Sequence, residues 1–256
     1  MREVLVREQP FAAAHRGSRV LWPENTMPAF QGAHDLGFRV FETDLHATAD
    51  GVLVTFHDPT LDRTTNATGP VASRTAAELS DVDAGHHFSR DGDHPWRGRG
   101  VGVPTLEEVA SSFPDVAMIL DLKAPGLEEL LADLIRRLDL WDRVVVGSFR
   151  DARLRRFRTL TEGRVATSSG PTETLAVKAR AWARRPATSP ADVFQVPTKA
   201  GITVVDAAFV SSAHAAGKHV HVWTVNEAHE MRRLLDLGVD GLITDRPDLL
   251  NEVLGR

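Results

Sequence analysis

The sequence contains no cysteine, and this absence excludes disulfide bonds, thiolate nucleophiles and thiolate metal ligands together. Any metal ion must therefore be bound by oxygen or imidazole ligands. The chain also lacks an apolar run near the ~18 residues of a membrane span. Charged residues interrupt positions 1–8 before a signal-peptide core could form. We therefore expect a soluble, cytoplasmic protein with no membrane span.

The chain has no block of lysine and arginine long enough to bind a nucleic acid backbone. Thirty basic residues stand against thirty-five acidic ones, for a net charge of -5. We therefore expect no nucleic-acid partner. With 256 residues and 42% hydrophobic content, the chain can bury a core as one α/β barrel or as two small domains. Because no linker or repeat divides it, we favour a single domain over residues 1–256.

Short β-branched runs alternate with helical patterns along the chain, which is typical of a parallel sheet wrapped by helices. Apolar residues at helical spacing mark Leu127–Leu138 and Glu227–Leu237, and Gly238 is a suitable C-terminal residue for the second helix. The predicted strands are Phe11–Ala14, Arg39–Leu45, Val52–Phe56, Val116–Leu122, Val144–Ser148, Val165–Ser168, Val193–Val196, Val220–Val225 and Gly241–Thr244. The alternation predicts an α/β fold, a TIM (β/α)8 barrel, with one strand to spare.

Two segments interrupt this alternation. The connection between Asp44 and Val52 is shorter than the dozen or so residues of a parallel crossover, and Asp50-Gly51 within it is typical of a hairpin turn. One of the flanking strands is therefore predicted to be an antiparallel addition. Residues 59–104 are rich in Asp, Gly, His and Arg and exceed the length of about 15 residues expected for a plain loop. We predict an insertion after the third strand that folds over the barrel mouth.

Carboxylates at strand ends are the first candidates for chemistry. Glu42 and Asp44 lie two residues apart on one strand and project from the same face. Without a cation, such a buried pair would repel and take up a proton, so Mg²⁺ or Ca²⁺ is the economical explanation. The alternative is a solvated or salt-bridged strand end. Asp121 and Lys123 repeat the spacing and predict a third ligand beside a phosphate-binding cation.

Two histidines end strands that would open onto the same face of a barrel. His15 and His57 are candidates for general acid and base, because imidazole titrates near neutral pH. A lone histidine in such a place is more often structural, but two of them beside a predicted metal site favour catalysis. Arg16 has the planar guanidinium that binds phosphate oxygens. These residue types together predict metal-assisted chemistry on a phosphate.

Short motifs through nearly the whole chain resemble, in order, those of the glycerophosphodiester phosphodiesterase family. They are H-R-G at 15–17, P-E-N-T at 23–26, E-T-D at 42–44, D-G-V-L-V-T-F-H-D at 50–58, L-D-R-T-T at 61–65, V-P-T-L-E-E-V at 103–109, D-L-K at 121–123, V-V-V-G-S-F at 144–149, V-W-T-V-N at 222–226 and G-L-I-T-D-R-P at 241–247. Each motif is weak alone, but the combination is specific.

The resemblance implies a TIM barrel with an insertion near the third strand. It also implies hydrolysis of a small glycerophosphodiester to an alcohol and glycerol 3-phosphate with a divalent metal ion. The implied site has His15 and His57 as the general acid and base, Glu42 and Asp44 as metal ligands, Arg16 and Lys123 on the phosphate, Asn25 ordering the substrate site, and Trp223 lining the glycerol or leaving-group side.

Asp121 departs from the family, which usually carries glutamate at this position. The shorter side chain withdraws the carboxylate by about one bond length, which bears on metal identity and strength. Two alternatives remain open: a non-catalytic module that binds phosphodiesters, and a lysophospholipase D-like or sphingomyelinase D-like phosphodiesterase that releases a cyclic phosphate. The sequence also leaves open the headgroup, the order of the two histidines, the attacking oxygen and the oligomeric state.

Overall fold

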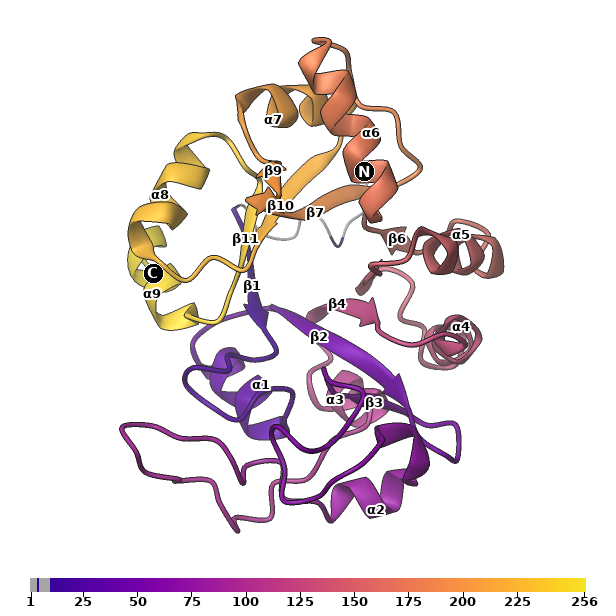
Figure 1. The fold of residues 1–256 in the computed structure, drawn as a ribbon, viewed down its shortest axis with the longest axis vertical. Helices are drawn as coiled ribbons and strands as arrows, with labels where there is room; N and C mark the ends of the chain where they lie inside the picture. Colours follow the sequence, from indigo (N-terminus) through magenta and orange to yellow (C-terminus); the bar gives the residue numbers. More distant parts are fainter. Residues whose placement is uncertain (1–3, 5–9) are drawn as a thin grey trace.

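A computed structural model describes residue 4 and residues 10–256 (Figure 1). The sequence analysis predicted no signal-peptide core in residues 1–8. Of these residues the structure describes only residue 4, so this prediction lies outside the described residues. The barrel strands are β1 (Phe11–His15), β2 (Val40–Ala47), β4 (Ala117–Leu122), β5 (Val144–Gly147), β6 (Ala166–Thr167), β7 (Val193–Pro197), β10 (His219–Trp223) and β11 (Gly241–Thr244). All nine predicted strands are present, with ends shifted by at most two residues.

Eight parallel strands form the barrel in the order β6-β5-β4-β2-β1-β11-β10-β7. An isolated parallel bridge between Ser168 and Val193 joins the two outer strands, so the sheet closes on itself. The helices around it are α1 (Met27–Asp35), α3 (Leu106–Ser112), α4 (Leu127–Leu138), α5 (Asp151–Leu160), α6 (Pro171–Trp182), α7 (Ala207–His214), α8 (Ala228–Asp236) and α9 (Pro247–Leu254). The predicted TIM barrel is confirmed.

The surplus strand is β3 (Leu53–Thr55), which pairs antiparallel with β2. Gly51 at the turn has a φ of 77°, a conformation that glycine adopts at little cost. The predicted hairpin addition is therefore confirmed. A second hairpin, β8 (Lys199–Ala200) with β9 (Ile202–Thr203), was not predicted, because two-residue strands leave no alternating pattern in the sequence.

Residues 59–104 contain a 3-10 turn (Val71–Ser73) and α2 (Ala76–Ser80). Thr75 and Glu78 form a capping box that begins α2. The segment has a small apolar cluster of its own, to which Leu61, Leu79 and Val103 contribute. In Figure 1 it lies outside the ring of strands, beside β3 and α1.

Alternating residues of the strands build two apolar layers. On β1, Phe11 and Ala13 pack inside the barrel, and Ala12 and Ala14 pack against the helices. The interior layer is an apolar cluster to which Phe11, Ala13, Val40, Ile119 and Ile243 contribute. In the described part of the chain, no helix is long and apolar enough to cross a membrane.

The interior also contains His221, which is fully buried and stacks on Phe11 with 4.1 Å between ring centroids. Among residues 4 and 10–256, neither of its ring nitrogens has a hydrogen-bond partner. Burial lowers the pKa of His221 to about 3, so the folded protein holds a neutral imidazole. Below the ordinary imidazole pKa, the unfolded chain binds a proton that the folded chain does not, and stability therefore falls as pH decreases.

We expect His221→Phe to weaken this acid sensitivity. The wild type should lose about 1.4 kcal/mol per pH unit below pH 6.5 through this group, and the variant should not. Urea unfolding at pH 7 and pH 5 measures the difference. His229→Phe, at an exposed position, is the control. Identical pH slopes for the wild type and His221→Phe would contradict the assignment.

Candidate active site

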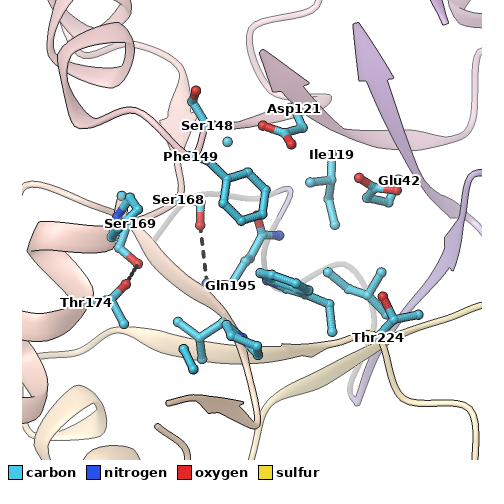
Figure 2. A pocket seen from close by; sticks show the side chains of 18 of the residues that line it. Glu42, Ile119, Asp121, Ser148, Phe149, Ser168, Ser169, Thr174, Gln195 and Thr224 are labelled. Carbon is cyan, nitrogen blue, oxygen red and sulfur yellow. Dashed lines mark hydrogen bonds between the residues drawn. The ribbon is translucent and has the colours of Figure 1, made fainter. Parts of the chain in front are cut away.

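A cavity of about 620 Å³ opens at the carboxyl ends of the barrel strands. Eight of the nine predicted site residues line it: His15, Arg16, Glu42, Asp44, His57, Asp121, Lys123 and Trp223. Figure 2 shows Glu42 and Asp121 on one side of this cavity and, on the other, Ser169, which follows β6, and Thr174 of α6. The ninth residue, Asn25, is buried behind the wall and bonds to Asp44 rather than lining the cavity.

His15 ends β1 and is held by a carboxylate that the sequence analysis did not assign. Its Nδ1 lies 2.6 Å from Asp245 Oδ1, and its Nε2 lies 3.7 Å from Glu42 Oε2. Burial opposes charge on His15, but Glu42 and Asp245 outweigh it and raise its pKa. Asp245 is fully buried, and despite that burial its hydrogen bond with His15 lowers its pKa to about 2.

Asp245 directly follows β11. This position at the end of a barrel strand could have identified it from the sequence as a site residue. It also accepts hydrogen bonds from Asn226 Nδ2 at 2.9 Å and Arg19 Nε at 2.9 Å. These contacts fix the carboxylate, which in turn fixes the His15 ring with Nε2 on the cavity side. Asp245 is therefore a positioning residue.

His57 is paired in the same manner. Its Nδ1 lies 2.5 Å from Asp58 Oδ1, and Arg63 Nε donates to Asp58 Oδ2 at 2.5 Å. Arg63 also donates two hydrogen bonds to Glu24, which accepts a third from Arg16. A continuous chain of opposite charges thus connects the two histidine motifs. Among residues 59–104, none lines the cavity, and the segment reaches the site through Arg63.

Asp44 lies between the two predicted phosphate-binding cations. Arg16 Nε is 3.0 Å from Asp44 Oδ2, and Lys123 Nζ is 2.9 Å from Asp44 Oδ1. Burial would raise the pKa of Asp44, but these cations outweigh it and lower that pKa. Asn25 donates to Asp44 Oδ2 at 3.2 Å and accepts from Thr43. The carboxylate therefore aligns both cations with the cavity.

The loop that carries Arg16 is held tightly against α1. Gly17 has a φ of 74°, and a Cβ there would lie 2.6 Å from the carbonyl carbon of Ala29. Only glycine meets both conditions without strain. The H-R-G motif therefore combines an arginine that lines the cavity with a residue that lets the loop approach the helix.

Glu42 and Asp121 each present a buried oxygen without a hydrogen-bond partner, Oε2 and Oδ1 respectively. Burial and the neighbouring Asp44 raise the pKa of Glu42 to about 7, and burial raises the pKa of Asp121 despite Lys123. Asp121 pairs with Asp44 in the β2–β4 register and lies 2.6 Å from Lys123 Nζ. Hard, under-coordinated oxygens of this kind suit Mg²⁺ or Ca²⁺.

The carboxylates do not yet gather around a common point. Among residue 4 and residues 10–256, no group of three or more His, Asp or Glu side chains is already arranged as a metal site. The physical reason is that Asp44 and Asp121 both turn toward Lys123. The donor set fits a divalent cation chemically, and its binding would require these side chains to reorient.

Comparisons with known proteins indicate a single family. The chain matches the Glycerophosphoryl diester phosphodiesterase family over residues 15–249. It is 40% identical, over 95% of its length and 90% of the relative, to a Mycobacterium tuberculosis protein named "Probable glycerophosphodiester phosphodiesterase 2".

Two solved structures share the fold. The glycerophosphoryl diester phosphodiesterase domain of a second Mycobacterium tuberculosis protein superposes with a TM-score of 0.84 at 22% identity, covering 97% of this chain and 100% of that one. An Oleispira antarctica phosphodiesterase, solved with its product sn-glycerol-3-phosphate, gives a TM-score of 0.76 at 24% identity, covering 98% and 99%.

The barrel, the polar residues at its carboxyl end and the sequence relatives define a hydrolase of phosphoric diesters. The chain belongs to the glycerophosphoryl diester phosphodiesterase family.

We expect Asp245→Asn to lower kcat by about 10²-fold or more while leaving KM within a few-fold, because the amide no longer fixes the imidazole in the tautomer that acts through Nε2. Steady-state kinetics on a glycerophosphodiester measures this. Asp240→Asn is the matched control, since Asp240 pairs with His214 at 2.8 Å and does not line the cavity. Equal kcat values for the two variants would refute the role of Asp245.

Proposed function

We propose that this protein hydrolyses glycerophosphodiesters to an alcohol and glycerol 3-phosphate, with His15 and His57 as the general acid and base and with a divalent metal ion. The observation that carries the proposal is the pair of histidine–carboxylate contacts at one cavity that Arg16 and Lys123 also line. The family membership and the names of the relatives support the same substrate class.

Arg16 and Lys123 are suited to bind the diester phosphate. Both cations line the cavity, and both are oriented by Asp44. Negative charge builds on the non-bridging oxygens as the phosphorus becomes pentacoordinate. Preorganised cations stabilise that charge more than they stabilise the ground state, which lowers the barrier.

The two histidines can move the protons that the reaction requires. Each ring has its Nδ1 on a carboxylate, so each exchanges protons with the substrate through Nε2. One histidine takes the proton from the attacking oxygen, and the other donates a proton to the departing alkoxide. The P–O bond to the leaving alcohol breaks as the bond to the attacking oxygen forms.

Glu42, Asp44 and Asp121 are the residues that would hold the metal ion. The support is the pair of buried oxygens that lack partners, Glu42 Oε2 and Asp121 Oδ1, beside the Asp44 carboxylate. When bound, such an ion polarises a phosphoryl oxygen and stabilises developing charge. The cations Arg16 and Lys123 then remain available to the other phosphate oxygens.

The first test is release of glycerol 3-phosphate from a panel of glycerophosphodiesters. His15→Ala and His57→Ala are each expected to lower kcat by about 10²- to 10⁴-fold, because each removes a proton-transfer group. Treatment with EDTA is expected to abolish release, and Mg²⁺ or Ca²⁺ to restore it.

His214→Ala is the control for the histidine variants, because His214 is exposed and distant from the cavity lining. Wild-type rates in either active-site variant would contradict the assigned acid–base pair, and full activity in EDTA would contradict the metal. Accumulation of a cyclic phosphate in place of glycerol 3-phosphate would identify internal transfer.

Asp121→Glu tests the third metal ligand separately. We expect the longer side chain to carry its carboxylate about one bond length further into the cavity and to lower the metal concentration that gives half-maximal rate by about 10-fold. Metal titrations of the wild type and the variant measure this. An unchanged half-maximal concentration would show that Asp121 does not hold the ion.

A further inference from the structure

The cavity extends well beyond the catalytic cluster. Its outer wall is formed by the segment after β5, the first half of α6 and the β8–β9 hairpin. Three large apolar side chains on this wall are exposed: Phe149 at 56%, Leu175 at 59% and Ile202 at 42%. Among the described residues only six large apolar side chains are exposed, and half of them therefore line this one cavity.

The charges of the cavity disfavour a cationic leaving group. The carboxylates that line it are Glu42, Asp44 and Asp121, all within the catalytic cluster. The charged residue on the outer wall is Lys178, which is buried and already lies 2.5 Å from Asp206. The aromatic face of Phe149 has the Lys123 ammonium 5.2 Å from its centroid. On the outer wall, an ammonium headgroup would therefore find no carboxylate to pair with, and the aromatic face of Phe149 already has one cation near it.

The hydroxyl groups of the wall are largely engaged within the protein. Ser169 and Thr174 bond to each other at 2.8 Å, and Ser168 accepts from the Gln195 backbone (Figure 2). Ser148 donates to the Leu122 carbonyl. The side-chain nitrogen of Gln195, which lines the cavity, is buried and has no hydrogen-bond partner among the described residues. The outer wall thus offers apolar surface rather than a set of free polar groups.

We propose that the leaving alcohol is uncharged and carries an alkyl or acyl chain, which lies against Phe149, Leu175 and Ile202. This inference rests on the proposed function, and it narrows the substrate to amphipathic glycerophosphodiesters. The alkyl or acyl chain of the substrate would cover apolar protein surface that is otherwise exposed to water. Each methylene that leaves water should therefore raise kcat/KM by about two- to fourfold.

The test uses sn-glycerol 3-phosphate esters of methanol, butanol and octanol, with glycerophosphocholine, all below their micellar concentrations. Release of glycerol 3-phosphate gives kcat/KM for each. The octyl ester is expected to exceed the methyl ester by about 100-fold or more, and also to exceed glycerophosphocholine. A ratio near one, or a preference for glycerophosphocholine, would overturn the proposal.

Variants of the outer wall then test where the alkyl chain of the substrate binds. Leu175→Ser and Ile202→Ser are each expected to lower the octyl-to-methyl ratio by about fivefold or more, since each removes apolar surface from the wall. Leu36→Ser is the matched control, because Leu36 is exposed at the end of α1 and does not line the cavity. An equal effect of Leu36→Ser and Leu175→Ser would also overturn the proposal.

A binding measurement separates this inference from the proposed function. If no ester releases glycerol 3-phosphate, the proposed function fails. Calorimetric titration with octyl phosphate and methyl phosphate then still tests whether the outer wall binds an alkyl chain. Octyl phosphate is expected to bind about 100-fold more tightly than methyl phosphate, and Leu175→Ser is expected to reduce that difference. Equal affinities would overturn the inference.

Discussion

The active-site geometry depends on one ion-paired carboxylate, Asp44, at the end of β2. Arg16 and Lys123 approach it from opposite sides, and Asn25 bonds to it from behind. A buried carboxylate needs such partners, because burial without them would force it to take up a proton. The pairing therefore stabilises Asp44 and, in the same contacts, orders both cations at the mouth of the barrel.

The architecture could be predicted because the barrel strands are runs of buried apolar residues, and such runs alternate clearly with amphipathic helices such as Leu127–Leu138. The short connection at Asp50-Gly51 also revealed the antiparallel strand. The β8–β9 hairpin could not be predicted, since two-residue strands depend on contacts made elsewhere in the fold. The same holds for the path of residues 59–104, which packs around a cluster of its own.

For the site, strand ends and motif spacing brought eight predicted residues to one cavity. The partners of the histidines were harder to predict. Asp245 lies 230 positions from His15, and Arg63 bonds to Glu24 across 39 positions, so only the closed barrel brings them together. The apolar wall was missed because Leu175 has the ordinary spacing of a helix residue. Its exposure becomes visible only once the neighbouring strands are in place.

The closure of the barrel is uneven around its circumference. β2 and β4 share six register pairs, whereas three other neighbouring pairs, β5–β6, β1–β2 and β10–β11, share two each. Only a single bridge, between Ser168 and Val193, joins β6 to β7. Breathing of the cylinder requires the fewest broken hydrogen bonds at this thin seam. This seam lies next to the outer wall of the cavity, on the side of the barrel away from β1, β2 and β4 (Figure 1). Motion that widens the cylinder is therefore expected first between β6 and β7.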